Sequence, residues 1–566
     1  MIFMKSLFIA FIFSLSSSHA ANLTTIAEKS GWKKTGNAEE TASLCREFQK
    51  EFPKQVKCLS YGTTPENRTL HYLVVGDPKK PVVWVQAGIH AGEIDGKDST
   101  FLLVREIVQN KILPNPLTGL CLVFVPIVNL DGHERIGKWN RPNQIGPEEM
   151  GWRTTAQNYN MNRDFMKADS AEMNHLLKLW HKMDPVLSLD LHVTDGAQFQ
   201  PEVGVIVLPN DYFGNSNLHK AGKIFETYLV DHVNRSGHKA LPFYPSFEED
   251  DVPTSGFSRY VATARFAHGY WYNNNRLGML VETHSWKDYA TRVQTHHDTV
   301  LSALYLAQQS AGEWRKAAAA LDQQNLAETK VELEFKHTDK FRTIDFEGYK
   351  YKIQKSAISG GDVIRYDSSA KETWKVPFYE ELKPTLVVTA PKEGYYIPAS
   401  ESWLVEKLVV HDIKTHKIKR NIKDEFEVFR ATKTTLSHGS FEGHQTLVVE
   451  GKWQNEKTEI QSGSFFVPVK QPKARLLLQL LEPQAVDSYL AWGMFNRFFE
   501  RKEYMENYVA EDVAIEMLKT PEIKKEFELK LKDETFAKDP EQRYHFFYQK
   551  HASWDKVFNR YPVFKK

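Results

Sequence analysis

The sequence predicts an α/β fold with a mostly parallel, mixed central sheet flanked by helices over residues 21–315. Short runs that are apolar on both faces, as buried strands are, alternate there with amphipathic stretches of helical spacing. Near Leu326 the pattern changes, which predicts a β-rich accessory region followed by a helical C-terminal segment. A chain of 566 residues is too long for one hydrophobic core, so several domains are expected.

The predicted strands of the first region are nearly continuous in apolar character, as expected for a sheet that helices cover on both sides. They lie at residues 82–87, 120–128, 186–191, 204–208 and 278–283. Helical patterns separate them at residues 100–108 and 218–233, and a further helix runs from Met173 to Met183 until Pro185 ends it. This alternation predicts parallel strands joined by crossover helices.

The second half of the chain has short apolar runs separated by turns, which is typical of β-structure. Strands are predicted at residues 331–335, 346–353, 374–377, 386–389, 404–410 and 446–449. We therefore place a β-rich accessory domain at residues 326–470. Residues 471–566 are predicted to be helical, with aromatic side chains such as Tyr489 and Trp492 packing on the rest of the protein. The sequence does not identify what residues 326–566 do.

The first 20 residues have the pattern of a secretory signal. One positive charge at Lys5 precedes the mostly apolar residues 6–16, and Ser18 and Ala20 are small residues at cleavage-site positions. The alternative is an uncleaved membrane anchor, but this apolar stretch is too short to span a bilayer comfortably. No later segment is long and apolar enough, so we expect an exported protein, periplasmic or secreted, without a membrane span in the mature chain.

Charge and cysteine content narrow the function further. The 73 Lys and Arg residues nearly cancel the 72 Asp and Glu residues, so no overall field attracts nucleic acid. Cys45 and Cys58 flank a short polar stretch and can pair after export, while free thiols are an equal alternative. Cys121 lies in an apolar run and is predicted to be a buried thiol. No cysteine spacing resembles a zinc site.

Two candidate metal ligands follow the first predicted strand. His90 and Glu93 stand three residues apart in a loop opened by Gly88, and imidazole and carboxylate are both ligands of zinc. A catalytic zinc takes three protein ligands and keeps one position open, so a third ligand is needed. His192 ends the third predicted strand, where ligands gather in open α/β sheets. A histidine at a strand end is more often structural, so the three residues carry the hypothesis only together.

Glu282 is the candidate general base, which in a hydrolytic zinc site is a carboxylate that does not bind the metal. It lies in the apolar strand 278–283, where a glutamate without a role is costly to bury. A buried salt bridge is the alternative. The setting of Glu282 matches that of His192, which favours the catalytic role.

Three further residues concern the charge of the substrate. Asn162 and Arg163 suit recognition of a carboxylate, because arginine binds it through two parallel hydrogen bonds and asparagine adds donors. Arg153, next to Trp152, can stabilise the oxyanion that develops at a scissile carbonyl. Either arginine alone is more often a surface or ion-pair residue, so their meaning depends on the metal ligands.

Taken in order, these residues resemble the zinc carboxypeptidases of the carboxypeptidase A type. The resemblance covers roughly residues 60–310 and rests on one ordered set: His90-x-x-Glu93, Trp152-Arg153, Asn162-Arg163, His192 and Glu282. It implies one zinc ion per chain at the edge of the sheet. The zinc ligands would be His90, Glu93 and His192. Glu282 would act as general base and then general acid, with Arg153 at the oxyanion and Asn162 and Arg163 on the substrate's terminal carboxylate.

The chain departs from the family pattern at one position and leaves another open. Asn160 stands where the family has an aspartate that supports a zinc-bound histidine, and an amide accepts this hydrogen bond with less charge. The family's mobile tyrosine aligns with Tyr260, and Tyr270 and Tyr272 are nearby rivals. The specificity pocket falls near Ala267, from which no side-chain preference follows.

The sequence therefore predicts a zinc metallocarboxypeptidase that removes C-terminal residues from peptides with a free carboxylate. One alternative keeps the chemistry and changes the substrate: a zinc amidase or deacylase acting on cell-wall peptides or N-acyl amino acids. The pairing of Arg153 with Asn162 and Arg163 favours the carboxypeptidase. A second alternative is an inactive binding module, against which the intact set of ligands, base and arginines argues. The natural substrate and the oligomeric state cannot be read from the sequence.

Overall fold

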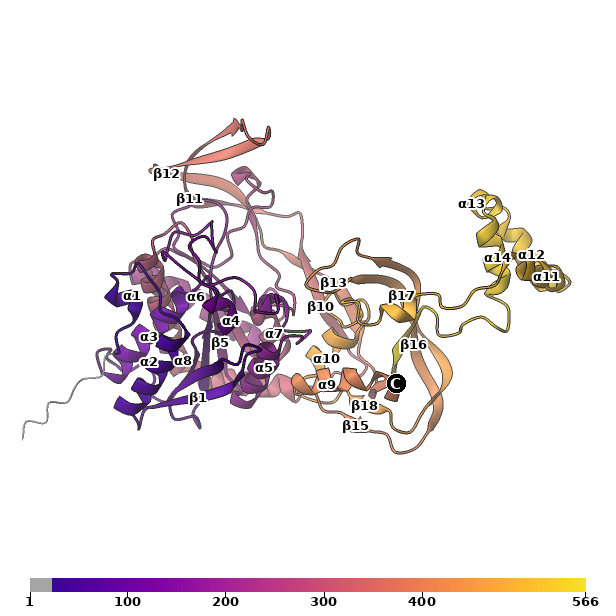
Figure 1. Ribbon diagram of the computed structural model, residues 1–566, viewed down its shortest axis with the longest axis horizontal. Helices are drawn as coiled ribbons and strands as arrows, with labels where there is room; N and C mark the ends of the chain where they lie inside the picture. Colours follow the sequence, from indigo (N-terminus) through magenta and orange to yellow (C-terminus); the bar gives the residue numbers. More distant parts are fainter. Residues whose placement is uncertain (1–22) are drawn as a thin grey trace, which may run out of the picture.

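An eight-stranded sheet with helices on both faces forms the first part of the molecule (Figure 1). The computed structural model describes residues 23–566, and the predicted signal at residues 1–20 lies outside the described residues. The strand order is β1-β2-β4-β3-β5-β9-β6-β7. The strands are β1 (Val56–Thr63), β2 (Thr69–Gly76), β3 (Val82–Ala87), β4 (Cys121–Val125), β5 (Leu187–Val193), β6 (Val203–Leu208), β7 (Ala240–Leu241) and β9 (Leu277–Thr283). The four central strands β4, β3, β5 and β9 are parallel to one another, whereas β1, β2 and β6 pair antiparallel with their neighbours toward the centre. The mixed, mostly parallel sheet of the prediction is confirmed.

The helices of this part cover both faces of the sheet. They are α1 (Ile26–Lys29), α2 (Ala38–Glu51), α3 (Asp95–Val108), α4 (Leu130–Glu134), α5 (Ala171–Met183), α6 (Asn217–Arg235), α7 (Ala267–Asn273) and α8 (Tyr289–Asp322). In β3, Val83 and Val85 pack in the same core as α3, α6 and α8, while Val82 and Trp84 pack with α5 and α7. Alternate residues of a strand point to opposite faces, so a strand covered on both sides is apolar throughout.

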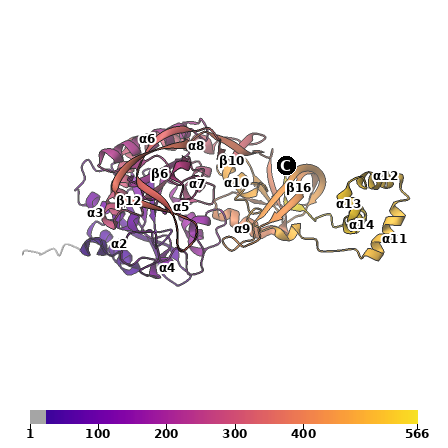
Figure 2. The same cartoon turned by 90° about the horizontal axis from the view of Figure 1, so that it is seen from above.

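The second part of the chain builds three further sheets (Figure 2). One pairs β10 (Lys330–His337) with β13 (Leu382–Thr389). The next is the long hairpin of β11 (Arg342–Lys355) and β12 (Asp362–Tyr379), which adds β8 (Phe257–Ser258) from the first part. The third has the order β15-β18-β14-β19-β16-β17 and contains β14 (Gly394–Ile397), β15 (His416–Lys417), β16 (Ile422–Leu436), β17 (Leu447–Ile460), β18 (Phe465–Pro468) and β19 (Arg560–Lys565).

Six helices accompany these sheets in the described part of the second half. They are α9 (Ser402–Val410), α10 (Ala474–Leu481), α11 (Asn507–Met517), α12 (Pro521–Lys530), α13 (Glu534–Lys538) and α14 (Pro540–Tyr548). The last four form a small cluster at one end of the molecule (Figure 1). Across residues 23–566, no helix is long and apolar enough to cross a membrane.

Two elements of the second half differ from the prediction. Residues 404–410 were expected as a strand and instead belong to helix α9, so that prediction is wrong. Leu404 and Leu408 stand one helical turn apart and are fully buried, and this tertiary burial outweighs the strand preference of the neighbouring valines. In the segment expected to be helical, β19 joins the six-stranded sheet through buried residues such as Tyr561 and Val563.

The two halves share one hydrophobic core. Trp84 of the first sheet and Trp180 of α5 belong to the same buried cluster as Leu404, Leu477 and Tyr561 from the second half. Because apolar surface of both halves is removed from water in one cluster, each half stabilises the other.

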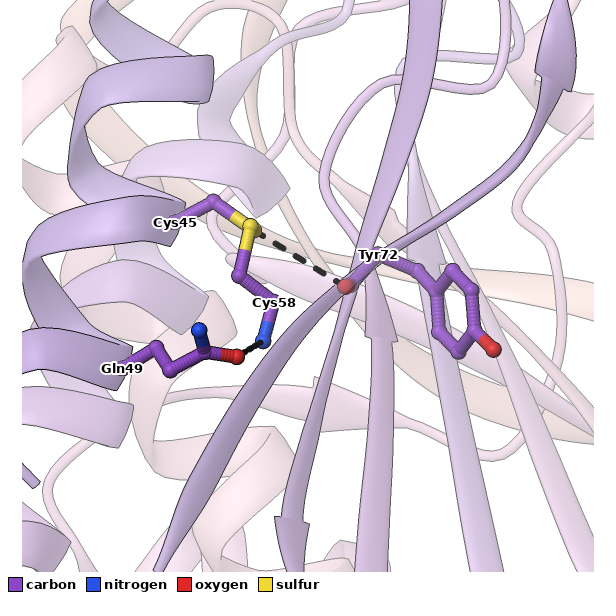
Figure 3. Close-up of a disulfide and its surroundings, with 4 residues drawn as sticks. All are labelled: Cys45, Gln49, Cys58 and Tyr72. Atoms are coloured by element: carbon purple, nitrogen blue, oxygen red, sulfur yellow. Dashed lines mark hydrogen bonds between the residues drawn. A yellow bond between two sulfur atoms is a disulfide. The ribbon is translucent and has the colours of Figure 1, made fainter. Parts of the chain in front are cut away.

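A disulfide joins α2 to the first strand of the sheet (Figure 3). It links Cys45 with Cys58, which the sequence left open, and the Cys58 N–H donates to Gln49 Oε1 over 2.9 Å. Cys121 is a buried free thiol, as predicted, and burial raises its pKa to about 12. His71 lies close enough to the two cysteines for the three residues to resemble a metal site. Both sulfur atoms are bonded to each other in the disulfide, so they are not free thiolate ligands.

Candidate active site

The first two predicted ligands lie in a tight loop between β3 and α3. Gly88 adopts a φ of 63°, a backbone conformation that glycine tolerates, and a β-carbon there would lie 3.1 Å from Ile94 Cδ1. The Glu93 N–H donates to His90 O over 2.9 Å, and this turn brings the two side chains together. His90 Nδ1 lies 3.0 Å from Glu93 Oε1, and both residues are buried.

The third predicted ligand reaches the same carboxylate from the neighbouring strand. His192 lies in β5, and its Nδ1 is 2.9 Å from Glu93 Oε2. One ligand atom from each of His90, Glu93 and His192 lies within 4.8 Å of the other two. The three residues therefore form a buried group that could hold a metal ion.

Each imidazole is held at its second nitrogen by a separate acceptor. His90 Nε2 lies 3.2 Å from Asn160 Oδ1, so the amide takes the supporting position that the sequence suggested. His192 Nε2 lies 2.9 Å from Asp190 Oδ2, and the Gln86 side chain donates to Asp190 Oδ1 over 3.0 Å. Such acceptors fix the ring orientation of a metal-bound histidine, which leaves Nδ1 of both rings turned toward Glu93.

The donor set fits a zinc ion, although one of its two imidazoles must lose a proton to bind it. Two imidazole nitrogens and one carboxylate oxygen are a common ligand set of catalytic zinc. Burial lowers the pKa of His90 to about 4, which keeps its ring neutral. Burial also opposes protonation of His192, but Asp190 and Glu93 outweigh it and raise its pKa well above the usual value. A metal ion binding there must displace this proton, so binding is expected to weaken as the pH falls.

Arg141 is a contact of the ligand group that the sequence reasoning missed. Its Nη1 lies 2.9 Å from Glu93 Oε1, and its Nη2 lies 3.2 Å from Asp195 Oδ1. Burial alone would raise the pKa of Glu93, but Arg141 and the two imidazoles hold it well below its usual range. Glu93 is therefore a carboxylate with a cationic neighbour. Arg141 lies in a loop without periodic pattern, so no sequence signal identified it.

A cavity of about 220 Å³ brings the predicted site residues together. Six of the seven line it, namely His90, Glu93, Arg153, Asn162, Arg163 and Glu282. The seventh, His192, joins the group through its contact with Glu93. Residues more than 190 positions apart in the sequence thus meet at one edge of the sheet.

Glu282 of β9 stands directly opposite His192 of β5 in the parallel register. Burial raises the pKa of Glu282 to about 8. Within residues 23–566, Glu282 Oε2 has no hydrogen-bond partner, and the carboxyl group forms no salt bridge with an arginine, lysine or histidine. The carboxyl group is available to accept and donate a proton in the cavity.

The two predicted arginines also line the cavity. Arg153 Nη1 is 3.6 Å from Glu93 Oε1, which places its positive charge beside the ligand group. The Arg163 guanidinium lies 4.5 Å from the centre of the Phe266 ring and donates through Nη1 to Asn162 O over 2.8 Å. Burial, with the repulsion of Arg153, lowers the pKa of Arg163. The cavity thus offers cationic groups to an anionic ligand.

The structure separates the three tyrosines that the sequence left open. Tyr260 lines the cavity. The Tyr270 hydroxyl lies 2.9 Å from both His181 Nε2 and His411 Nδ1 in the core. Tyr272 belongs to the cluster of Ile206 and Phe213, against which Tyr260 also packs, but it lines another cavity. Of the three, Tyr260 alone lines the cavity that Glu282 also lines.

Sequence reasoning missed three other residues of the site. Tyr244 and His268 line the cavity, and burial lowers the pKa of His268 to about 3, so its ring is neutral. Asp190 supports His192 from two positions earlier in the same strand. That spacing places both side chains on one face of β5, a signal that was present in the sequence.

Comparison with known proteins places this site in context. Residues 41–200 match the family model described as zinc carboxypeptidase. The chain is 22% identical over 430 residues to carboxypeptidase 2 of Trichophyton rubrum, covering 74% of each chain. It is 21% identical over 439 residues to carboxypeptidase 2 of Trichophyton tonsurans, covering 73% of each.

Solved structures of carboxypeptidases also resemble part of the chain. A carboxypeptidase A from Helicoverpa armigera superposes with a TM-score of 0.37 at 16% identity, over 50% of this chain and 75% of that one. A metallo-carboxypeptidase from Burkholderia cenocepacia superposes with a TM-score of 0.36 at 17% identity, over 48% of this chain and 69% of that one.

Proposed function

We propose that this chain, whose residues 41–200 match the family model described as zinc carboxypeptidase, is a metallocarboxypeptidase that removes C-terminal residues from peptides. One observation carries the proposal: a metal-ligand group, a carboxyl group without a salt bridge and two arginines line one cavity of about 220 Å³. Hydrolysis of an amide requires the metal-ligand group and the carboxyl group. Selection of a chain terminus also requires the arginines, which bind a carboxylate.

His90, Glu93 and His192 would hold one zinc ion per chain. Their buried N,N,O donor set supports this assignment, as do the acceptors at Asn160 and Asp190 that orient the two rings. Bound zinc supplies a Lewis acid that polarises a carbonyl group and acidifies a water molecule.

Glu282 would take a proton from the attacking water and then donate it to the amine of the departing residue. A general acid and base works best when its pKa lies near the working pH. The pKa of about 8, raised by burial, supports this double role, because the group can hold or release a proton near neutrality. The position of Glu282 opposite His192 places this exchange beside the ligand group.

The arginines and Tyr260 would bind the substrate. Arg153, beside Glu93, would stabilise negative charge on the carbonyl oxygen as it develops. Asn162 and Arg163 would hold the terminal carboxylate, so that the last peptide bond lies next to Glu282. Tyr260 would close on the bound residue from the same cavity.

Export through residues 1–20, to the periplasm or the exterior, belongs to the same proposal. The disulfide between Cys45 and Cys58 supports it, because such bonds persist in oxidising compartments. We further propose a catalytic domain at residues 21–315, a β-rich accessory domain at 326–470 and a mainly helical region at 471–566.

Digestion of a peptide library, read by mass spectrometry, tests the proposed function. The expected products are ladders shortened one residue at a time from the C-terminus, absent after chelation and formed far more slowly from amidated peptides. Equal rates on free and amidated peptides would contradict the clamp and favour an amidase or deacylase. Release of internal fragments would contradict exopeptidase action altogether.

A further inference from the structure

The loop between β8 and α7 carries two side chains of the cavity and lies between two contacts with the second half of the chain. Tyr260, near the beginning of this loop, and Phe266, at its end, both line the cavity. The Phe266 ring also packs against the Arg163 guanidinium. The position of this loop therefore fixes both a wall of the site and one side of the proposed carboxylate clamp.

The first end of this loop pairs with the long hairpin of β11 and β12. Phe257 and Ser258 form β8 and pair in parallel with the end of β12. The Arg259 N–H then donates to Tyr379 O over 2.8 Å. Tyr260 thus directly follows a segment whose backbone is hydrogen-bonded to β12 of the accessory region.

The second end is fastened by Asp487, which is fully buried. Its carboxylate accepts from the Arg265 backbone N–H over 2.9 Å and from Arg265 Nε over 2.5 Å. The Arg265 guanidinium also lies 4.7 Å from the centre of the Trp492 ring. A charge-assisted pair of this kind holds a loop more firmly than neutral contacts do.

A second loop, the clamp loop at residues 158–169, carries Asn162 and Arg163. The tip of the hairpin of β16 and β17 contacts it. At this tip Glu442 and Gly443 have φ values of 50° and 79°, and Phe441 and His444 exchange backbone hydrogen bonds around them. The Asn160 N–H donates to Glu442 Oε2 over 3.3 Å. A two-residue turn of this type presents Glu442 at a fixed position.

Asn160 links this hairpin tip to both the clamp and the ligand group. Its side-chain oxygen accepts from the Asn162 N–H, which opens the short η1 turn (Met161–Arg163), and lies beside His90 Nε2. Farther along the loop, His444 Nε2 lies 2.7 Å from Asp169 Oδ2. The clamp loop is therefore held at its beginning by Glu442 and at its end by His444.

We propose that the second half of the chain is a working part of the active site, with Asp487 and Glu442 as positioning residues for the two substrate-binding loops. This inference rests on the proposed function and assigns the role of residues 326–566 that the sequence left open. Contacts from the second half order these loops when the chain folds. Substrate binding then costs less conformational entropy, so the affinity for the terminal carboxylate rises.

Steady-state kinetics of point variants tests the inference, because the shared core makes removal of the whole region uninformative. Glu442→Ala is expected to raise KM for a free-carboxylate peptide about tenfold while kcat changes less than twofold. Glu442→Gln keeps an acceptor for the Asn160 N–H and is expected to restore KM. Glu450→Ala is the matched control, since among residues 23–566 this exposed carboxylate on the same hairpin pairs with Lys433 alone.

Hydrogen exchange of residues 158–169 and 259–266 supplies a readout that does not depend on activity. Exchange is expected to quicken at residues 158–169 with Glu442→Ala and at residues 259–266 with Asp487→Asn, while zinc content stays unchanged. If Glu442→Ala leaves both KM and exchange as in the wild type, the inference is overturned. If the wild type cuts no peptide yet the loops loosen as stated, the proposed function fails and the loop support stands.

Discussion

The metal-facing wall and the substrate-facing wall of the cavity are built in different ways. The metal-facing wall, called the sheet wall below, is built on the central sheet. His192 and Glu282 lie opposite each other on parallel strands, and Glu93 follows a third strand. The substrate-facing wall, called the loop wall below, is formed by loops that carry Arg163 and Tyr260. Backbone ladders fix the first wall, whereas contacts from the second half of the chain hold the second.

This difference separates chemistry from recognition. A side chain at the end of a buried strand inherits the rigidity of the sheet, which suits groups that must lie within hydrogen-bond reach of one another. Loops can change their supports without disturbing those groups. We therefore expect variants of the sheet wall to act on turnover and metal binding, and variants of the loop wall to act on substrate binding.

Glu282→Gln is expected to have the largest effect and to isolate the sheet wall. Loss of a general acid and base lowers kcat about 10²- to 10⁴-fold, while the amide keeps the shape of the side chain. Zinc content, measured by metal analysis, and KM are expected to stay near wild-type values. Near-normal turnover would remove Glu282 from the mechanism.

Arg141→Met tests the electrostatic support of the ligand group. Removing one partner of a buried ion pair costs about 3 kcal/mol of unfolding free energy, and here Glu93 would lose its nearest guanidinium. It would keep its two imidazole contacts, the Val193 N–H and the more distant Arg153 at 3.6 Å. A zinc ion neutralises the same carboxylate, so the loss is expected to be smaller with zinc than with a chelator. Denaturant unfolding under both conditions measures it, and equal losses would contradict the argument.

Arg163→Ala tests the loop wall. Loss of a two-point hydrogen bond to a carboxylate is expected to lower kcat/KM about 10²-fold for peptides with a free C-terminus. The slow background rate on the matching amidated peptides is expected to stay the same, since these lack the group that Arg163 would bind. An equal loss on both peptides would show that Arg163 supports the fold of the site and not the recognition of a terminus.

The sheet wall could be predicted from the sequence and the supports of the loop wall could not. His192 and Glu282 each end an apolar run, and a polar side chain at a strand end is a local signal. Arg141 lies in an irregular loop and meets Glu93 only through the tertiary fold. Asp487 meets Arg265 across 222 residues of chain, which no local pattern encodes.

The same reasoning explains the error at residues 404–410. Val405, Val409 and Val410 favour a strand by their branched side chains. The spacing of Leu404 and Leu408 matches one turn of a helix, and both are buried against the first half of the chain. Periodicity and branching therefore conflicted in the sequence, and packing between the two halves decided the outcome.

His238 gives the smallest expected effect and tests whether the sheet side can lose stability without altering recognition. Hydrogen bonds to Asp298 and Glu202 raise its pKa from 6.5 to about 9, so it binds a proton more tightly in the folded chain than in the unfolded one. The resulting stability is full below pH 6.5 and is lost as the pH rises toward 9.

Solvent screening at this partly exposed site reduces the effect to about 1 kcal/mol. The unfolding free energy of the wild type is therefore expected to fall by that amount relative to His238→Gln across this pH range. KM compared between the two proteins at any one pH is expected to be equal, because Glu202 and Asp298 contact neither substrate loop. A change in KM that follows the titration of His238 would mean that the two walls are coupled through β6 and α8.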